Sequence, residues 1–421
     1  MHEFQSADWL QTTVREVAMR WSALLAVLFI GVQIGHSSAA ENQKKYGPGV
    51  TDGEILIGQT IPYSGPNSAA SGAVKGQNAY FDMLNKKGGI NGRKIRIISL
   101  DDGYSPPKTV EQTRKLVEQE EVLAIVGAIG TPTGLAVQKY LNTKGVPQLL
   151  QTTGMSRFNA PKQFPWTTPF FFPFKLEGAL YAKYIRDHMP NAKIAVLSPN
   201  DDLGKEYLAG FREGLGPSAD SMIVKALTYE SSDPTADSQI ATLMASGADV
   251  FFNVSLGKFA PQTIRKSREL NPRMTMIVPS GSTSVGSTLQ PAGRDNAKGL
   301  IAGLWFKQPF SKDWANDNGV KEYLDLLREH LPGADPDNIT YMLGTMIAQI
   351  TEIILRNCGD DLTRENVLKQ ATNLKDVSLP MTLPGVRLTN DPADYNMLRQ
   401  IMLARFDGEQ WVPFTDALTV E

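Results

Sequence analysis

Short apolar runs alternate with amphipathic stretches along most of this chain. The apolar runs have the length and β-branched content of strands, whereas the stretches between them repeat their apolar residues with helical spacing. The expected strands are Ile55–Thr60, Lys94–Leu100, Leu123–Gly127, Pro147–Leu150, Lys193–Leu197, Asp249–Val254, Thr275–Val278 and Gly299–Trp305. The expected helices include Thr109–Glu120, Gly134–Asn142, Glu177–His188, Lys205–Leu215 and Pro261–Leu270.

This alternation predicts parallel β-sheets with helices on both faces, because two parallel strands need a crossover connection that a helix usually provides. The chain has 421 residues, which is more than one ordinary hydrophobic core contains. The sequence therefore indicates an α/β protein with two parallel-sheet domains.

One segment interrupts the alternation. Residues 164–174 (FPWTTPFFFPF) contain three prolines and six aromatic residues. Proline has no N–H group to donate within a central strand, so we expect this segment to be a connection between domains.

Residues 1–40 have the features of a signal peptide. Ala23–Gly35 is a short, mostly apolar run, and Ser38-Ala39-Ala40 offers small residues to a signal peptidase. The run is too short to span a bilayer. We therefore expect export to the periplasm and a mature protein that begins at Glu41, and the acidic residues at the extreme N-terminus favour a translation start at Met19.

Charge, cysteine usage and motifs exclude several functions. The chain has 42 Lys and Arg against 44 Asp and Glu, a net charge of −2, which provides no electrostatic footprint for nucleic acid. Its single cysteine, Cys358, cannot form an internal disulfide and is expected to be buried. The motifs GxxxxGK[ST], GxSxG, HExxH and CxxC are missing. We therefore expect no enzyme activity, no cofactor and no metal.

Ligands of open parallel α/β sheets bind beyond the carboxyl ends of the strands. There, residues 127–133 leave one expected strand and enter a helix, which Thr131 is expected to cap with Pro132 in its first turn. Free N–H groups and the positive end of the helix dipole would then face the crevice, an arrangement that holds a carboxylate. The alternative is that Thr131 only caps its helix. The next loop, 151–155, adds two hydroxyl groups beside Gly154.

Five motifs resemble those of the branched-chain amino-acid-binding family of periplasmic solute receptors for ABC importers. They are SGP (64–66), KGGINGRKI (87–95), DD (101–102) before a helix, AIVGAIGT (124–131) and GVPQLLQTTG (145–154). With interruptions, the resemblance runs from Thr51 to Phe414.

The resemblance implies a type I periplasmic binding protein, in which two α/β lobes on a three-segment hinge close over one small molecule. The three interlobe crossings would fall near residues 168–171, 302–306 and 396–400. Lobe I would then contain residues 51–168 and 303–396, and lobe II residues 169–302 and 397–421. The resemblance also implies a monomer that delivers its ligand to permease and ATPase subunits on separate chains.

The strand-end loops, together with the resemblance, indicate particular residues as ligand contacts. In lobe I these are Ser64 and Ser71 at the rim and the loop residues Ile129, Gly130, Thr131, Thr152, Thr153 and Gly154. In lobe II they are Asp202, Ser255, Ser280 and Gly281. The aromatic candidates are Phe171, Trp305 and Tyr341, for each of which hinge packing is an equal explanation.

Ser280 bears on the ligand class. At this position, amino-acid receptors of the family place a glutamate that binds the ammonium group of the ligand, whereas this chain has serine. A buried ammonium without its counter-charge costs on the order of 3–5 kcal/mol. We therefore expect a small carboxylic acid that lacks an α-ammonium, aromatic if the candidate rings face the cleft. The alternatives are an amino-acid or amide receptor, with Asp201 or Asp202 as the ammonium partner, or a ligand sensor on the same fold.

Overall fold

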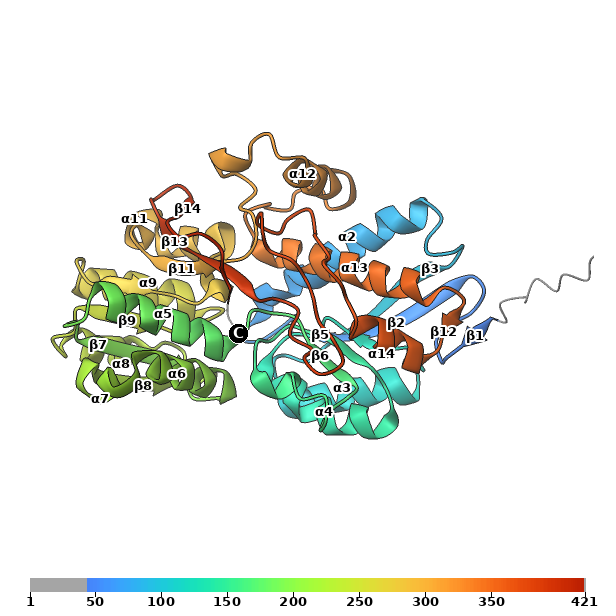
Figure 1. Ribbon diagram of the computed structural model, residues 1–421, viewed down its shortest axis with the longest axis horizontal. Coiled ribbons are helices and arrows are strands. Elements are labelled where there is room, and N and C mark those ends of the chain that lie inside the picture. The colour runs from blue at the N-terminus through green and yellow to red at the C-terminus, as the bar shows by residue number, and fades with distance from the viewer. Residues whose placement is uncertain (1–43, 420–421) are drawn as a thin grey trace, which may run out of the picture. The chain divides into compact units, whose positions relative to one another are not determined.

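β2 (Glu54–Ile61) forms the interior of the first sheet, and every residue from Ile55 to Ile61 is buried. The structure is a computed structural model that describes residues 44–419. The first sheet is parallel, with strand order β3-β2-β4-β5-β6 (Figure 1). Its other strands are β3 (Lys94–Asp101), β4 (Ile125–Val126), β5 (Gln148–Gln151) and β6 (Thr167–Pro169).

Helices cover both faces of this first sheet. On one face α2 packs against α13, and on the other α3 packs against α4 (Figure 1). These helices are α2 (Gly72–Lys86), α3 (Pro106–Glu118), α4 (Thr131–Lys144) and α13 (Ile339–Cys358). Further elements on this side of the chain are α12 (Asn318–His330), α14 (Arg364–Ala371) and the short parallel pair β1 (Lys45–Tyr46) and β12 (Asp361–Leu362).

The second sheet is parallel in its first half and antiparallel at its C-terminal edge. Its order is β14-β13-β11-β10-β9-β7-β8, and β15 pairs with β13. Its strands are β7 (Ile194–Pro199), β8 (Ile223–Tyr229), β9 (Val250–Asn253), β10 (Thr275–Ile277), β11 (Ile301–Leu304), β13 (Gln400–Phe406), β14 (Trp411–Pro413) and β15 (Leu418–Thr419).

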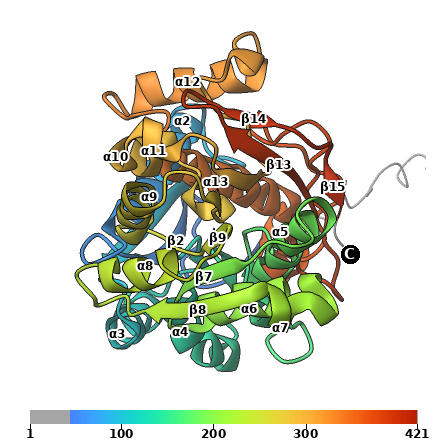
Figure 2. The ribbon, with the colours of Figure 1, turned by 90° about the vertical axis from the view of Figure 1, so that its left-hand side faces the viewer.

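Helices again cover this sheet on both sides. α5 and α6 pack together on one face, and α8 and α9 on the other (Figure 2). The helices are α5 (Phe174–His188), α6 (Asp202–Leu215), α7 (Ala219–Met222), α8 (Asp237–Met244), α9 (Phe259–Leu270), α10 (Gln290–Ala292) and α11 (Arg294–Ala297). The α/β class predicted from the alternating pattern is therefore confirmed.

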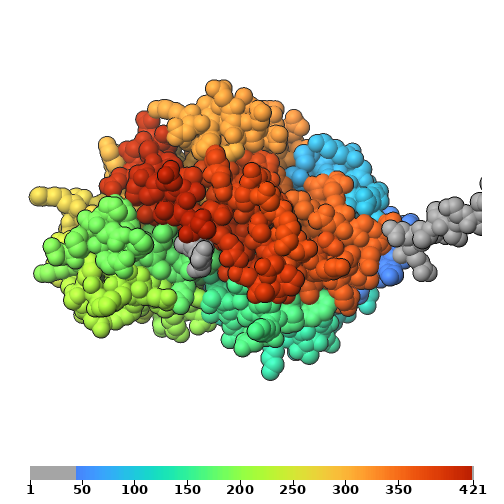
Figure 3. Space-filling model, in the orientation of Figure 1, coloured from blue at the N-terminus to red at the C-terminus, as the bar shows by residue number. Residues whose placement is uncertain are grey.

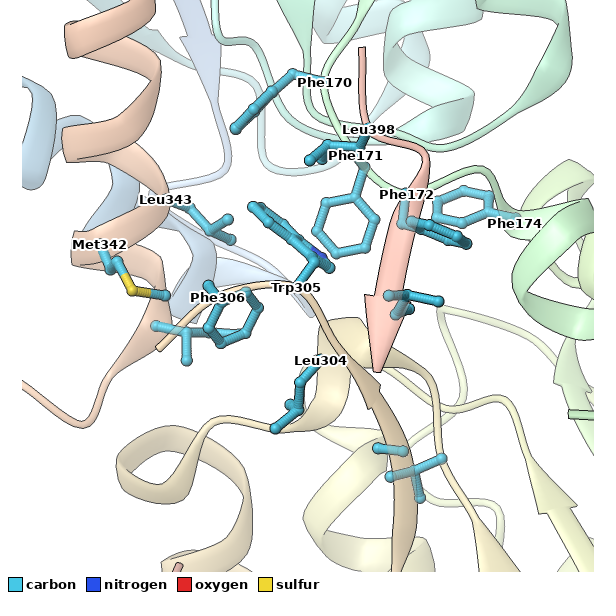
Figure 4. Close-up of a cluster of buried hydrophobic side chains, with 14 of the residues drawn as sticks. Phe170, Phe171, Phe172, Phe174, Leu304, Trp305, Phe306, Met342, Leu343 and Leu398 are labelled. Carbon is cyan, nitrogen blue, oxygen red and sulfur yellow. The ribbon is translucent and has the colours of Figure 1, made fainter. Parts of the chain in front are cut away.

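Aromatic rings pack together where the chain passes between the two sheets. The Trp305 ring lies edge-on to Phe170 and to Phe171, with ring centroids 5.9 and 5.8 Å apart. Figure 4 shows these rings beside Leu398, so segments around residues 170, 305 and 398 meet in one buried cluster. The strands of the two sheets fall close to the predicted lobe ranges, and we keep the names lobe I and lobe II for those ranges; the division itself stays a prediction.

Segments far apart in the sequence also lie together on the surface. In Figure 3 the chain after α14 lies against the segment that follows β5. Tyr395 N donates to Asn159 Oδ1 at 2.6 Å, and Asn159 Nδ2 donates to Asp394 Oδ1 at 2.9 Å. These bonds fix the last long loop before β13 to the segment that follows β5.

The structure corrects several local expectations. α5 and α6 begin three residues earlier than predicted, because Pro173 and Asp201 occupy the positions that precede their first turns. Residues 167–169 form strand β6 despite Pro169, and this is possible because β6 lies at the edge of its sheet. Thr131 is the first residue of α4 rather than its cap, since Gly130 occupies the capping position.

Other expectations concern single features. Cys358 is buried as predicted, and burial raises the pKa of its thiol to about 12. No helix between residues 44 and 419 is long and apolar enough to cross a membrane. The predicted signal peptide and the start at Met19 lie outside the described residues.

Candidate ligand-binding site

A cavity of about 140 Å³ lies where the strand ends of the two sheets meet. Its walls come from loops and helix starts of both lobes. From lobe I they are Asn67, Ala69, Ala70, Ala73, Tyr104, Ile129, Gly130, Thr131, Thr152, Ile339, Thr340 and Leu343. From lobe II they are Phe171, Phe174, Leu203, Tyr207, Leu256, Gly257, Gly281, Ser287 and Thr288.

The cleft around this cavity is closed in the structure. Ile339 N donates to Ser284 Oγ at 3.3 Å, and Ser156 N donates to Glu206 Oε1 at 3.1 Å, so both hydrogen bonds join lobe I to lobe II. Gly257 approaches the rim loop so closely that a Cβ there would lie 2.9 Å from Asn67 Oδ1.

The start of α4 supplies the polar end of the cavity. Gly134 N donates to Gly130 O at 3.1 Å as the first helical bond, so the N–H groups of Thr131 and Thr133 have no carbonyl partner inside the helix. Gly130 has φ +112°, a conformation that side-chain-bearing residues rarely adopt, and a Cβ there would lie 2.6 Å from a Tyr104 ring carbon. The glycine therefore lets the helix begin directly at the cavity wall.

The two threonines of the loop after β5 differ in whether they line the cavity. Thr153 is buried, and its Oγ1 lies 2.7 Å from Thr131 Oγ1. Thr152 lines the cavity, and within the described part of the chain its buried Oγ1 has no hydrogen-bond partner. Thr152 is thus the residue of this loop that can bond to a ligand, whereas Thr153 supports Thr131.

Tyr104 lines the cavity and was not among the predicted contacts. Its backbone has φ +60°, and Tyr104 N donates to Asp102 Oδ1 at 2.9 Å, so the buried Asp102 stabilises this left-handed turn. Burial raises the pKa of the Tyr104 hydroxyl, and the nearby Asp201 carboxylate adds to the rise. Residues in such conformations are frequent at binding sites.

Apolar side chains form most of the opposite wall. Leu203 and Leu256 follow strands of lobe II, and Phe171 and Phe174 come from the aromatic connection. Trp305 is fully buried behind Phe171 and does not line the cavity (Figure 4). Its Nε1 has no hydrogen-bond partner among the described residues, so Trp305 serves the hinge packing in this conformation.

Ser280 faces away from the cavity. Its N–H donates to Glu177 Oε1 at 2.6 Å and its hydroxyl donates to Glu177 Oε2 at 3.0 Å. Gly281, the next residue, does line the cavity. The structure therefore places a carboxylate beside Ser280, but on the side remote from the ligand space.

The two acidic residues at the start of α6 have different environments. Asp201 Oδ1 accepts from Gly204 N at 3.0 Å, so Asp201 caps α6. The Asp202 side chain is 47% exposed and lies 3.8 Å from Lys205 Nζ. Asp202 is therefore not a wall residue, whereas Asp201 lies near Tyr104.

The remaining predicted contacts lie outside the cavity wall. Ser64 Oγ donates to Asp101 Oδ2 at 2.8 Å. Ser255 Oγ lies 2.8 Å from Thr263 Oγ1, and Gly154 O accepts from Phe174 N at 2.9 Å. Ser71 precedes α2, and Tyr341 packs against Gly72 of that helix. None of these residues lines the cavity in the closed cleft.

Several wall residues were not among the predicted contacts. Leu203 and Leu256 follow β7 and β9 of lobe II, and Tyr104 follows the acidic pair at the end of β3. The apolar side chains of Leu203 and Leu256 do not by themselves separate a cavity wall from a core. Tyr207 lies one helical turn after Leu203, so the helical repeat would have placed it on the same face.

The site has no features of a metal centre. Across residues 44–419 no group of three or more His, Cys, Asp or Glu side chains could hold a metal ion. The cavity instead combines one polar end with apolar walls, which is typical of small-molecule binding sites.

Two sheet-based lobes, a closed cleft at their strand ends and a small cavity inside it define a type I periplasmic solute-binding protein. A family model for periplasmic binding proteins matches residues 54–410, and the chain belongs to this family. The resemblance to the branched-chain amino-acid receptors is thereby confirmed at the level of the family.

This chain is also similar to individual proteins of known sequence or structure. An amino acid binding protein of Pseudomonas aeruginosa is 22% identical over 263 residues, which are 59% of this chain and 66% of that protein. A branched-chain amino acid ABC transporter protein of Thermus thermophilus with bound valine superposes with a TM-score of 0.78 at 14% identity, covering 88% of this chain and 98% of that one. A solute-binding protein of R. palustris in complex with benzoate superposes with a TM-score of 0.71 at 18% identity, with the same coverages of 88% and 98%.

Proposed function

We propose that this chain is the extracytoplasmic receptor of an ABC importer and that it binds a small carboxylic acid without an α-ammonium group. One observation carries the proposal: the groups able to hold an anion lie at one end of the cavity, and the facing wall from lobe II is mostly apolar. Thr131, Thr152 and the start of α4 form the polar end. Periplasmic location and delivery to separate membrane subunits belong to the same proposal.

Thr131 can donate to a carboxylate only if its own hydroxyl proton is free. Met155 N donates to Thr153 Oγ1 at 3.2 Å, and Thr153 can then donate to Thr131 Oγ1 at 2.7 Å. In this arrangement the Thr131 proton is free to be donated to a ligand. Hydrogen bonds to a charged partner contribute about 1.5–3 kcal/mol each.

The volume of the cavity favours a single-ring or short branched acid. An apolar cavity of about 150 Å³ accommodates one benzene ring. The cavity here has about 140 Å³ and includes the ring of Phe171 in its wall. A benzoate-bound protein with the same fold supports this class of ligand.

The second candidate function is an amino-acid receptor. Asp201 favours it, because this half-buried carboxyl group lies near Tyr104, and the Tyr104 ring approaches Gly130 at the polar end of the cavity. Burial raises the pKa of Asp201, and hydrogen bonds from Gly204 and Leu203 partly oppose the rise. A ligand ammonium would have to reach this group past the Tyr104 ring.

Matched ligands decide between the two functions. L-leucine and 4-methylpentanoate differ only in the α-ammonium, and benzoate tests the ring. We expect calorimetry to show tighter binding of 4-methylpentanoate than of L-leucine, and thermal unfolding to show stabilisation by about 2.7 kcal/mol at a benzoate concentration a hundred times its Kd. Preferred binding of L-leucine would overturn the proposed ligand class and direct attention to Asp201.

A further inference from the structure

Glu177 is a completely buried carboxylate in the first turn of α5. No cationic side chain within residues 44–419 forms an ion pair with it in the structure. Burial raises the pKa of Glu177, and hydrogen bonds from Tyr181, Ser280 and Tyr207 oppose part of that rise. Burying a carboxylate without a cationic partner costs free energy, and these hydrogen bonds offset part of that cost.

Four donors converge on its two oxygens. Oε1 accepts from Tyr181 Oη at 2.5 Å and from Ser280 N at 2.6 Å. Oε2 accepts from Tyr207 Oη at 2.7 Å and from Ser280 Oγ at 3.0 Å. Both oxygens are thus satisfied by groups from α5, α6 and the loop after β10.

One of these partners, Tyr207, lines the ligand cavity, and a second, Ser280, adjoins a wall residue. Tyr207 lines the cavity with its ring while its hydroxyl is directed to Glu177. Ser280 immediately precedes the wall residue Gly281, and Glu177 accepts from both of its donors. The carboxylate therefore fixes the wall and keeps these donors away from the ligand.

The third partner, Tyr181, connects Glu177 to the interlobe crossing. Tyr181 Oη accepts from Gly303 N at 2.7 Å while it donates to Glu177, which orients the hydroxyl. Gly303 lies in β11, two residues before Trp305, and a Cβ at this position would clash with Ile401 of β13. A continuous path of hydrogen bonds thus runs from the hinge strand to the cavity wall.

We propose that Glu177 is a positioning residue that joins the lobe II wall of the ligand cavity to β11 at the interlobe crossing. The inference rests on the proposed function, because it takes the cavity as the ligand site. It adds that the apolar character of this wall depends on a carboxylate that does not contact the ligand. A change at Glu177 or Tyr181 then alters ligand affinity from outside the cavity.

The sharpest variant is Tyr181→Phe, which removes one buried hydroxyl and leaves every cavity-lining residue unchanged. Ile185→Ala is its matched control, because Ile185 is also buried in α5 but lies outside the network. Glu177→Leu removes all four acceptor contacts, and Glu177→Gln retains the shape with one acceptor oxygen. Amide hydrogen exchange at Ser280 and Gly303 reports on the network without ligand, and calorimetry with benzoate and 4-methylpentanoate reports on the cavity.

We expect Tyr181→Phe to speed amide hydrogen exchange at Gly303, and Glu177→Leu to speed it at both Ser280 and Gly303. In each case the increase in exchange rate should exceed the increase that Ile185→Ala causes. Affinity for the probe that the unmodified protein binds should fall about tenfold in Glu177→Leu and less in Glu177→Gln, within the usual range of coupling between neighbouring groups. Equal exchange in Tyr181→Phe and Ile185→Ala, or unchanged affinity in both network variants, would overturn the inference. If the unmodified protein binds neither probe, the proposed ligand class fails, while the exchange data still decide whether the network exists.

Discussion

Thr131 Oγ1 and Thr153 Oγ1 lie 2.7 Å apart, and this contact joins the two lobe I loops that form the polar end of the cavity. Thr131 begins α4, and Thr153 follows β5. Because the two strands before these loops are neighbours in a parallel sheet, their carboxyl ends bring the hydroxyl groups together. The groups that are proposed to bind the carboxylate therefore depend on two loops, and not on the start of one helix alone.

Thr131→Val should weaken the binding of the carboxylate ligand by about 1.5–3 kcal/mol, because one hydrogen bond to a charged group is lost while the shape is kept. Isothermal calorimetry with benzoate measures this loss. Thr143→Val is the control, since Thr143 is exposed in the same helix and bonds only to Lys139 O. An equal loss in both variants would show that the effect arises from the helix and not from the anchor.

Thr153→Val should weaken the same binding without removing any wall residue, because Thr131 loses the neighbour that orients its proton. We expect about 0.5–1.5 kcal/mol, the usual contribution of a neutral hydrogen bond. Thr153→Ser keeps the hydroxyl and should restore most of the affinity. Failure of the serine variant to restore it would mean that the methyl group, not the hydrogen bond, matters.

Gly130→Ala should destabilise the protein by about 1–3 kcal/mol, since φ +112° is strained for any residue with a Cβ. The added atom would also lie 2.6 Å from the Tyr104 ring and press on the cavity wall. Thermal unfolding measures the stability and calorimetry the affinity, and both should fall. Gly88→Ala is informative as a control, because Gly88 also has positive φ but has no neighbouring atom within 4 Å of its added Cβ.

The ionisation of Asp101 makes the free energy of unfolding depend on pH. Burial alone would raise its pKa, but the Lys108 ammonium, the Ser64 hydroxyl and backbone N–H groups of Gly103 and Ser64 hold the pKa of Asp101 well below its ordinary value. A carboxyl group whose pKa is lowered by folding stabilises the native state above its unfolded pKa of about 4, and this contribution is lost as the pH falls below that value.

Denaturant unfolding between pH 6 and pH 2 tests this dependence. We expect Asp101→Asn to lower the free energy of unfolding at pH 6 and to reduce the decline of that free energy toward acid. The exposed Asp416 provides the control variant Asp416→Asn. Parallel pH profiles for Asp101→Asn and the unmodified protein would show that the Lys108 and Ser64 contacts do not act through ionisation.

The sequence identified the loops of lobe I that form the cavity because their chemistry is local. Gly130 and Thr131 stand between an apolar strand and a helix, and Thr152 follows the next strand, so strand order alone brings them to one edge. In contrast, the apolar wall residues Leu203 and Leu256 carry no signal that separates a cavity wall from a core, since both environments select the same side chains.

By itself, the sequence determined the α/β class, the alternation of strands and helices and the presence of hydroxyl-rich loops after the strands, because periodicity and turn chemistry are encoded over neighbouring residues. Only the tertiary structure decided which hydroxyl faces the cavity and which is bound elsewhere. Ser280 and Glu177 are 103 positions apart in the chain, and Tyr181 meets Gly303 across 122. Such pairings depend on how α5 packs against the second sheet, and no local pattern of apolar and polar residues specifies that packing.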